Sequence, residues 1–160
     1  MTDIESRPTA TDYQQILRVR AGAQALFDAL TDPAGLASWW TRVTGSGEAG
    51  GELRFYFDSP ENPCVMRVDE ATRPTSVRWT VTACGFLPDW VGTRPTFAIT
   101  PIDAGAAELR FRHEGLTAEL DCIDQCTSGW NHFLESLRRY AETGRGMPFG
   151  SEADAARRLR

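Results

Sequence analysis

Two histidines and four cysteines are the side chains of this sequence best suited to acid–base chemistry or to metal binding. His113 ends an alternating run, residues 108–113, and falls on the same face as Phe111. An imidazole there titrates near neutral pH, so it could act as an acid or base or donate to a ligand carbonyl. The alternative is a structural histidine bonded to a neighbouring backbone carbonyl. His113 is the only candidate for a catalytic residue, and we expect His132 near the surface.

The cysteines are Cys64, Cys84, Cys122 and Cys126. Cys122 and Cys126 are one helical turn apart, and a zinc site that added Asp121, His113 or His132 can be imagined. Structural zinc sites usually hold a second pair of thiols farther along the chain, which this sequence lacks. We therefore expect small buried thiols, with no metal and no other cofactor.

Other catalytic motifs are missing from the sequence. It contains no glycine-rich phosphate loop, nucleophile elbow, zinc-protease helix or dinucleotide fingerprint. Glu119 and Asp121 precede the last helix, where carboxylates serve as N-terminal charge or caps. Neither carboxylate needs a catalytic role.

Composition restricts the class of protein further. The chain has 160 residues, 41% of them hydrophobic, which suits a single domain that buries roughly 70% of the surface its unfolded form exposes. The net charge is -5, and the basic residues are scattered arginines, which argues against a nucleic-acid or membrane-surface partner. No apolar run approaches the ~18 residues of a membrane span, and no secretory signal is evident. We expect a cytoplasmic protein.

The elements that would position these side chains follow from hydrophobic periodicity. The strongest pattern is an amphipathic helix near the C-terminus, which ends before Gly144 and cannot resume at Pro148. Its apolar stripe consists of Ile123, Cys126, Trp130, Phe133, Leu134, Leu137 and Tyr140. Upstream we predict a strand at 13–20, helices at 22–30 and from 31 to 40, and strands at 52–57, 65–68, 77–81, 96–99 and 108–113.

The predicted strands have one polar and one aromatic face. Arg78 and Thr80 oppose Trp79, and Arg110 opposes Phe111. The aromatic face of this curved antiparallel sheet must pack against the last helix. The order β-α-α-β(6)-α is that of the helix-grip fold, an α+β architecture.

Individual residues also resemble those of a known family. The chain is similar to the SRPBCC superfamily, and more narrowly to the branch homologous to the activator of the ninety-kilodalton heat-shock protein ATPase. The resemblance spans about residues 13–148 and rests on Leu26–Asp32, Trp39-Trp40, Val77–Trp79, Phe111–Leu116, Gly129-Trp130, Phe133–Leu137 and Tyr140–Pro148. We accordingly expect a flexible segment at 1–11, one helix-grip domain at 12–148 and a charged tail at 149–160, able to form a short helix.

The resemblance implies an apolar cavity between the last helix and the sheet, because relatives bind hydrophobic ligands there. If residues 45–47 and the second short helix form its mouth, one of Trp39 and Trp40 would line the cavity and the other would cover the opening or anchor a partner surface. Alternatively, both pin the short helices to the sheet. Trp90 would be exposed or form a lid. An ordinary, fully packed core is the alternative. The expected ligand-binding residues are Trp39, Trp40, Phe55, Phe57, Trp79, Phe97, Phe111, His113, Cys126, Trp130, Phe133 and Leu137.

Three classes of function are consistent with the sequence. The first is binding of a small hydrophobic molecule, and the second is a cyclase- or isomerase-like enzyme that uses His113 in the same cavity. The third is a co-chaperone or protein-interaction module; it is disfavoured because eukaryotic activators carry an additional chaperone-binding domain for which we see no room. An exposed sheet edge is compatible with a homodimer.

Overall fold

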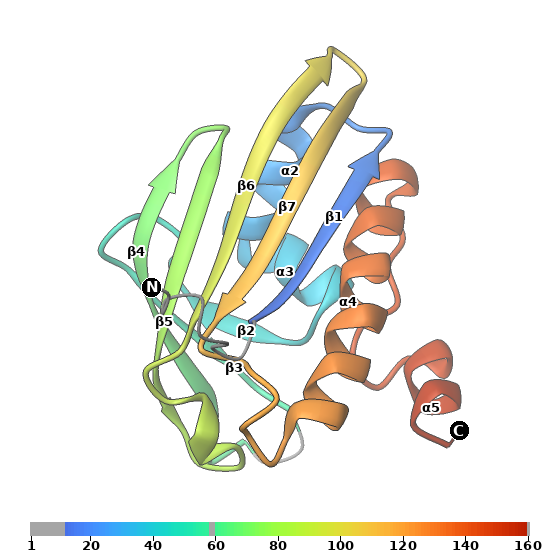
Figure 1. The fold of residues 1–160 in the computed structure, drawn as a ribbon. Helices are drawn as coiled ribbons and strands as arrows, with labels where there is room; N and C mark the ends of the chain where they lie inside the picture. The colour runs from blue at the N-terminus through green and yellow to red at the C-terminus, as the bar shows by residue number, and fades with distance from the viewer. Residues whose placement is uncertain (1–11, 58–59, 160) are drawn as a thin grey trace, which may run out of the picture.

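The computed structural model describes residues 12–57 and 60–159 and has the predicted helix-grip architecture (Figure 1). The expected flexible segment at residues 1–11 lies outside the described residues. The elements in chain order are β1 (Tyr13–Val19), α2 (Ala23–Thr31), α3 (Pro33–Trp39), β2 (Val43–Gly45), β3 (Glu52–Phe55), β4 (Cys64–Thr72), β5 (Ser76–Cys84), the 3₁₀ helix η1 (Pro88–Trp90), β6 (Arg94–Asp103), β7 (Ala106–Glu114), α4 (Ile123–Thr143) and α5 (Glu152–Leu159).

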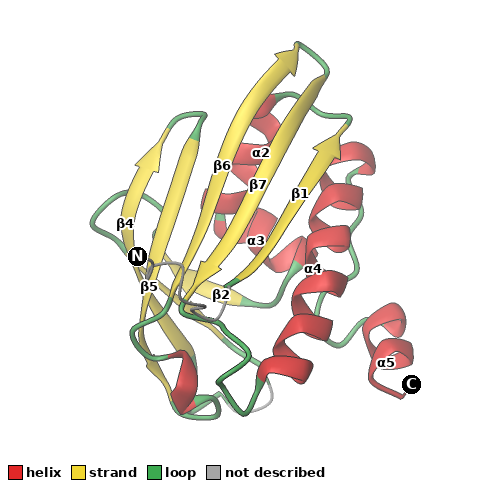
Figure 2. Cartoon of the chain, in the orientation of Figure 1, coloured by secondary structure: helices red, strands yellow, loops and turns green. Residues whose placement is uncertain are grey.

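All seven strands form one antiparallel sheet in the order β1-β7-β6-β5-β4-β3-β2. Helices α2, α3 and α4 lie on the same face of this sheet (Figure 2). Strand β2 was not predicted, because three residues are too few to show an alternating pattern. The two edge strands of the sheet are β1 and β2. Helix α4 packs against the same face of the sheet as α2 and α3, and the other face is exposed to solvent.

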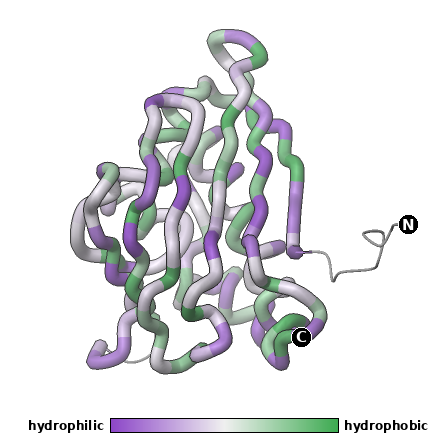
Figure 3. The backbone as a smooth tube through the Cα atoms, turned by 60° about the vertical axis from the view of Figure 1, so that its left-hand side comes forward, coloured by the Kyte–Doolittle hydropathy of each residue, from purple (hydrophilic) through white to green (hydrophobic). Residues whose placement is uncertain are grey.

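The predicted alternation of faces is confirmed in the strands. Along β7, Leu109, Phe111 and His113 are buried, whereas Arg110 and Arg112 are exposed. Each of these arginines pairs with a carboxylate, Arg110 with Glu108 and Arg112 with Asp12. The alternation of hydropathy is visible along the strands in Figure 3.

Helix α4 buries most of the predicted stripe, whereas Ile123 and Tyr140 at its two ends are half-buried. Its C-terminal cap is Gly144, whose φ of 85° is the left-handed conformation that glycine tolerates best. Ser136 is a polar member of the buried stripe. Its hydroxyl donates to the carbonyl of Trp39 and accepts from the amide of Met147, which fastens the chain that follows α4 to helix α3.

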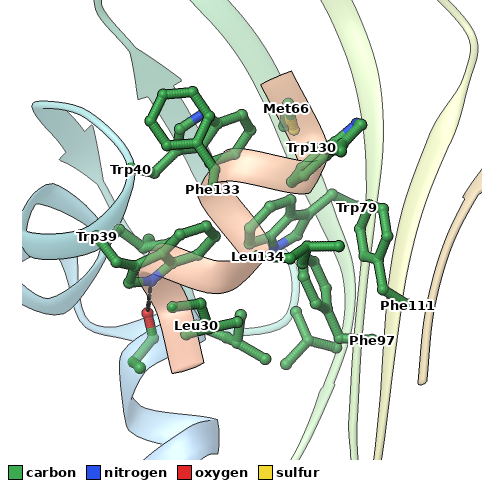
Figure 4. Close-up of a cluster of buried hydrophobic side chains, with 14 of the residues drawn as sticks. Leu30, Trp39, Trp40, Met66, Trp79, Phe97, Phe111, Trp130, Phe133 and Leu134 are labelled. Carbon is green, nitrogen blue, oxygen red and sulfur yellow. Dashed lines mark hydrogen bonds between the residues drawn. The ribbon is translucent and has the colours of Figure 1, made fainter. Parts of the chain in front are cut away.

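Aromatic rings fill the centre of the molecule between the sheet and α4 (Figure 4). Trp39 is fully buried and donates from Nε1 to the carbonyl of Ala29, 2.8 Å away. Trp79 contacts the rings of Phe55 and Phe97 at centroid distances of 5.6 and 5.0 Å. Buried rings in mutual contact therefore occupy the middle of the concave face, as in an ordinary protein core.

The C-terminal residues fold back onto the domain. The sequence predicts a charged tail with a short helix, and the structure contains that helix as α5, beside the first half of α4 (Figure 1). Asp154 on α5 is fully buried and accepts from the amide of Gly150, 2.9 Å away. Helix α5 is thus packed against the domain. Among the described residues, no helix is both long and apolar enough to cross a membrane.

Candidate functional site

A partly open cavity of about 290 Å³ lies between the first half of α4, η1 and α5. Helix α4 contributes Trp130 to the cavity wall, and η1 contributes Trp90, which faces Trp130. Its walls are mostly apolar. They are formed by Trp40, Phe57, Asn62, Phe86, Leu87, Trp90, Gln125, Cys126, Gly129, Trp130, Phe133, Phe149, Arg157 and Arg158.

Three indole rings form the inner wall of the cavity. Trp90 and Trp130 are parallel, with centroids 6.1 Å apart and an interplanar angle of 1°. Trp40 contacts Trp130 at 5.0 Å. On the outer side, Phe57 contacts both Phe86 and Phe149, at 5.4 and 5.2 Å. The cavity is suited to stacking against a flat apolar molecule.

The polar ends of the two parallel indoles are bonded within the protein. Trp130 donates from Nε1 to Nδ1 of His113 at 3.0 Å, and Nε2 of His113 lies 2.8 Å from the hydroxyl of Thr93. The Thr93 hydroxyl donates to the carbonyl of Trp90 at 2.6 Å. Trp90 in turn donates from Nε1 to Sγ of Cys126 at 3.2 Å. An indole N–H can only donate, so Nδ1 of His113 is the acceptor and Nε2 carries the proton.

His113 is a neutral structural histidine in this network. It is fully buried, and burial lowers its pKa to about 3. It is not among the residues that line the cavity. The structural interpretation of this residue is therefore favoured, although its partners are the side chains of Trp130 and Thr93 where a backbone carbonyl was expected.

The imagined zinc ligands are not brought together. All four cysteines are buried and free. Burial raises the pKa of Cys126 to about 12, so its thiol stays protonated. Nε2 of His132 lies 2.9 Å from the carbonyl of Met147. Within the described parts of the chain, no group of three or more His, Cys, Asp or Glu residues is arranged to hold a metal ion.

The structure divides the expected ligand-binding residues into two groups. Trp40, Phe57, Cys126, Trp130 and Phe133 line the cavity. The remainder lie in the core outside it, namely Trp39, Phe55, Trp79, Phe97, Phe111, His113 and Leu137. The cavity lies where α4 begins, whereas buried rings pack against one another beneath the middle of the helix.

The expected mouth of the cavity is elsewhere in the structure. Residues 45–47 line a separate polar depression with Phe27 and Asp28. Trp90 is buried, with 7% of its surface exposed, and forms part of the wall. The mouth lies instead near Phe86, which is 46% exposed, and near α5.

Several residues that line the cavity were not predicted from the sequence. Asn62, Phe86, Leu87 and Phe149 lie in loops without a periodic pattern, and Arg157 and Arg158 resemble an ordinary charged tail. One signal was available at Gly129, because a glycine inside a helix is costly unless space or function requires it. A Cβ atom built at Gly129 meets nothing within 4 Å.

Comparison with known proteins agrees with this fold. A family model described as "Activator of Hsp90 ATPase homolog 1-like protein" matches residues 20–142. The chain belongs to this family. Its membership places the protein in the SRPBCC superfamily and confirms the resemblance inferred from the sequence. Helix α5 lies beyond the matched residues.

Solved structures of this fold include the Aha1 dimer from Colwellia psychrerythraea, with a TM-score of 0.71 and 25% identity over 84% of this chain and 98% of that chain. DynU16, a putative protein in the dynemicin biosynthetic locus, has a TM-score of 0.67 and 22% identity over 87% of this chain and 49% of that chain. CalU16 from Micromonospora echinospora has a TM-score of 0.67 and 16% identity over 91% and 80%. The comparison with curated proteins finds no significant match.

Proposed function

We propose that this family member binds a small, flat, largely apolar molecule in the cavity at the start of α4. The observation that carries the proposal is the cavity itself, because rings surround a volume that the protein does not fill. Its size is near the lower end of the range for small-molecule pockets, about 300–1,000 Å³. A molecule of one or two fused rings is therefore the expected guest.

The hydrogen-bond network supports recognition through ring faces. Trp90 and Trp130 both use their N–H groups inside the protein. Both rings line the cavity, so the ring surfaces that border it can contact a ligand. Each aromatic contact contributes about 0.5–1.5 kcal/mol beyond area burial. The bonds also hold the two rings in place before binding, so little side-chain entropy is lost when a ligand enters.

A catalytic role has less support than binding. His113 was the acid–base candidate, and its two nitrogens are occupied by Trp130 and Thr93. Its neutral form persists at physiological pH because its pKa lies near 3. A cyclase-like reaction would need an acid or base at the cavity wall, and the Cys126 thiol, with its raised pKa, does not provide one.

Gly129→Leu tests the proposal by filling the cavity from within. The new side chain enters open space at a helical position, so we expect the fold to persist. The probe is 1-naphthaleneacetamide, a neutral two-ring molecule. At a hundredfold excess over its dissociation constant, a ligand stabilises the native state by about 2.7 kcal/mol.

We expect thermal denaturation to show this gain for the wild type and no gain for Gly129→Leu. Gly129→Ala is the matched control, since one added carbon leaves most of the cavity open and should retain the gain. Equal stabilisation of the wild type and Gly129→Leu, or of neither protein, would argue against the cavity as a binding site. Native mass spectrometry of the purified protein would identify a resident molecule directly.

A further inference from the structure

Helix α5 brings two positive charges to a cavity whose other walls are uncharged and mostly apolar. Arg157 and Arg158 both line it. Their guanidinium groups lie over aromatic rings, Arg157 over Phe133 at 5.5 Å and Arg158 over Phe149 at 4.7 Å. These cation–π contacts keep both groups at the cavity.

Within the described parts of the chain, one carboxylate, that of Asp154, pairs with these two arginines. Oδ1 of Asp154 lies 2.6 Å from Nη2 of Arg157, and Oδ2 lies 3.3 Å from Nε of Arg158. Burial alone would raise the pKa of Asp154, but the amide of Gly150 and the two arginines outweigh it and the pKa is lowered. Asp154 is therefore ionised and neutralises one of the two positive charges. Within the described residues, none that lines the cavity is acidic.

Both arginines have N–H groups without a hydrogen-bond partner among the described residues. Nε of Arg157 is buried without a hydrogen-bond partner. Arg158 forms an ion pair with Asp154 through Nε, and no hydrogen bond or ion pair of its two terminal nitrogens is found within residues 12–57 and 60–159. A buried unpaired donor costs free energy, and an excess charge beside apolar walls attracts an anion. The side chain of Arg158 is 44% exposed, so its free donors can reach a ligand at the mouth.

We infer that the ligand of this cavity carries a single carboxylate, which Arg158 binds through its two terminal nitrogens while the ligand's rings pack against the sides of Trp40, Trp90 and Trp130 that line the cavity. This inference rests on the proposed function and adds the chemical class of the ligand, an aromatic monoanion. A planar guanidinium matches a carboxylate in a bidentate arrangement. Arg157 and Asp154 hold the end of α5 in position for this contact.

The test compares two probes of nearly identical shape, 1-naphthaleneacetate and its neutral amide, by isothermal titration calorimetry. We expect the wild type to bind the acetate at least about tenfold more tightly, because hydrogen bonds to charged groups are roughly twice as strong as neutral ones. Arg158→Gln should abolish this preference by lowering the affinity for the acetate much more than the affinity for the amide. Since Arg157 still pairs with Asp154 in this variant, α5 should stay in place.

Arg145→Gln is the control, because it removes the same charge beyond the far end of α4; it should keep the preference. Arg158→Lys should retain part of the preference, since it keeps the charge and loses the planar fork. Equal affinity of the wild type for both probes would overturn the inference and leave the proposed function standing. A preference that survives in Arg158→Gln would overturn the assignment to Arg158. Failure of the wild type to bind either probe would overturn both proposals.

Discussion

The indole N–H of Trp130 donates to Nδ1 of His113 across 3.0 Å, and this bond connects the long helix α4 to strand β7. Both residues are buried. The bond fixes the tautomer of the histidine and the orientation of an indole that forms the cavity wall. His113 thus acts on the site by positioning Trp130, and it does not touch the cavity itself.

Replacing His113 by alanine is expected to destabilise the protein by about 2–4 kcal/mol. The change leaves the N–H of Trp130 without an acceptor in the core and creates a void. Urea denaturation measures the loss. His132→Ala is the matched control, because His132 is only half-buried and should cost about 1 kcal/mol or less. Equal losses in the two variants would contradict the structural role of His113.

The same histidine makes stability depend on pH. Its pKa is about 6.5 in an unfolded chain and about 3 in the folded protein. As the pH falls, the unfolded state therefore binds a proton before the folded state does. The contribution of neutral His113 to the free energy of unfolding is complete above pH 6.5 and is lost as the pH falls towards 3. The loss is about 1.4 kcal/mol per pH unit.

Proton NMR provides the direct measurement, since the chain has two histidines and His132→Gln assigns their signals. The signals of His113 should not titrate between pH 5 and 8. A midpoint near 6.5 for His113 would contradict the network described above.

Asp154→Asn should loosen α5. The substitution removes the charge that pairs with Arg157 and Arg158 and costs about 1–3 kcal/mol of local stability. Amide hydrogen exchange across residues 152–159 is expected to accelerate, with little change in the sheet. Glu152→Gln, an exposed change on the same helix, should leave the exchange unaltered. Unchanged protection of α5 in Asp154→Asn would show that other contacts hold the helix.

Two glycine-to-alanine substitutions should act in opposite directions. Gly129→Ala adds a methyl group in open space within α4, so we expect a gain of about 0.5–1 kcal/mol. Gly146→Ala would place its Cβ 2.5 Å from the carbonyl oxygen of Ser38 and should cost about 1–3 kcal/mol. Thermal denaturation of both variants checks the pair. Destabilisation by Gly129→Ala would show that the space beside α4 is already filled.

Periodicity predicted most of the fold because strands with one buried face alternate and α4 has a wide apolar stripe. The pattern placed His113 and Phe111 on the inner face correctly. It could not identify the partner of His113, since Trp130 lies 17 residues away and only the packing of α4 brings the two together. Both interpretations of the histidine were consistent with the sequence alone.

The position of the cavity was beyond the reach of sequence patterns. Alternation shows which side chains point inward, but it does not show whether their volumes fill the space. Phe97 and Phe111 point inward and pack solidly, whereas Trp130 also points inward and borders a cavity. Arg157 lies at the cavity beside Phe133, a residue distant from it in the sequence. The composition of the C-terminal segment does not reveal such a contact.

Indole NMR signals of the five tryptophans test the central claim most directly. On titration with 1-naphthaleneacetamide, we predict large shifts for Trp40, Trp90 and Trp130, which line the cavity, and small ones for the core residues Trp39 and Trp79. The shifts should vanish in Gly129→Leu. Saturating shifts confined to Trp39 and Trp79, or the same response in Gly129→Leu, would contradict binding between α4, η1 and α5.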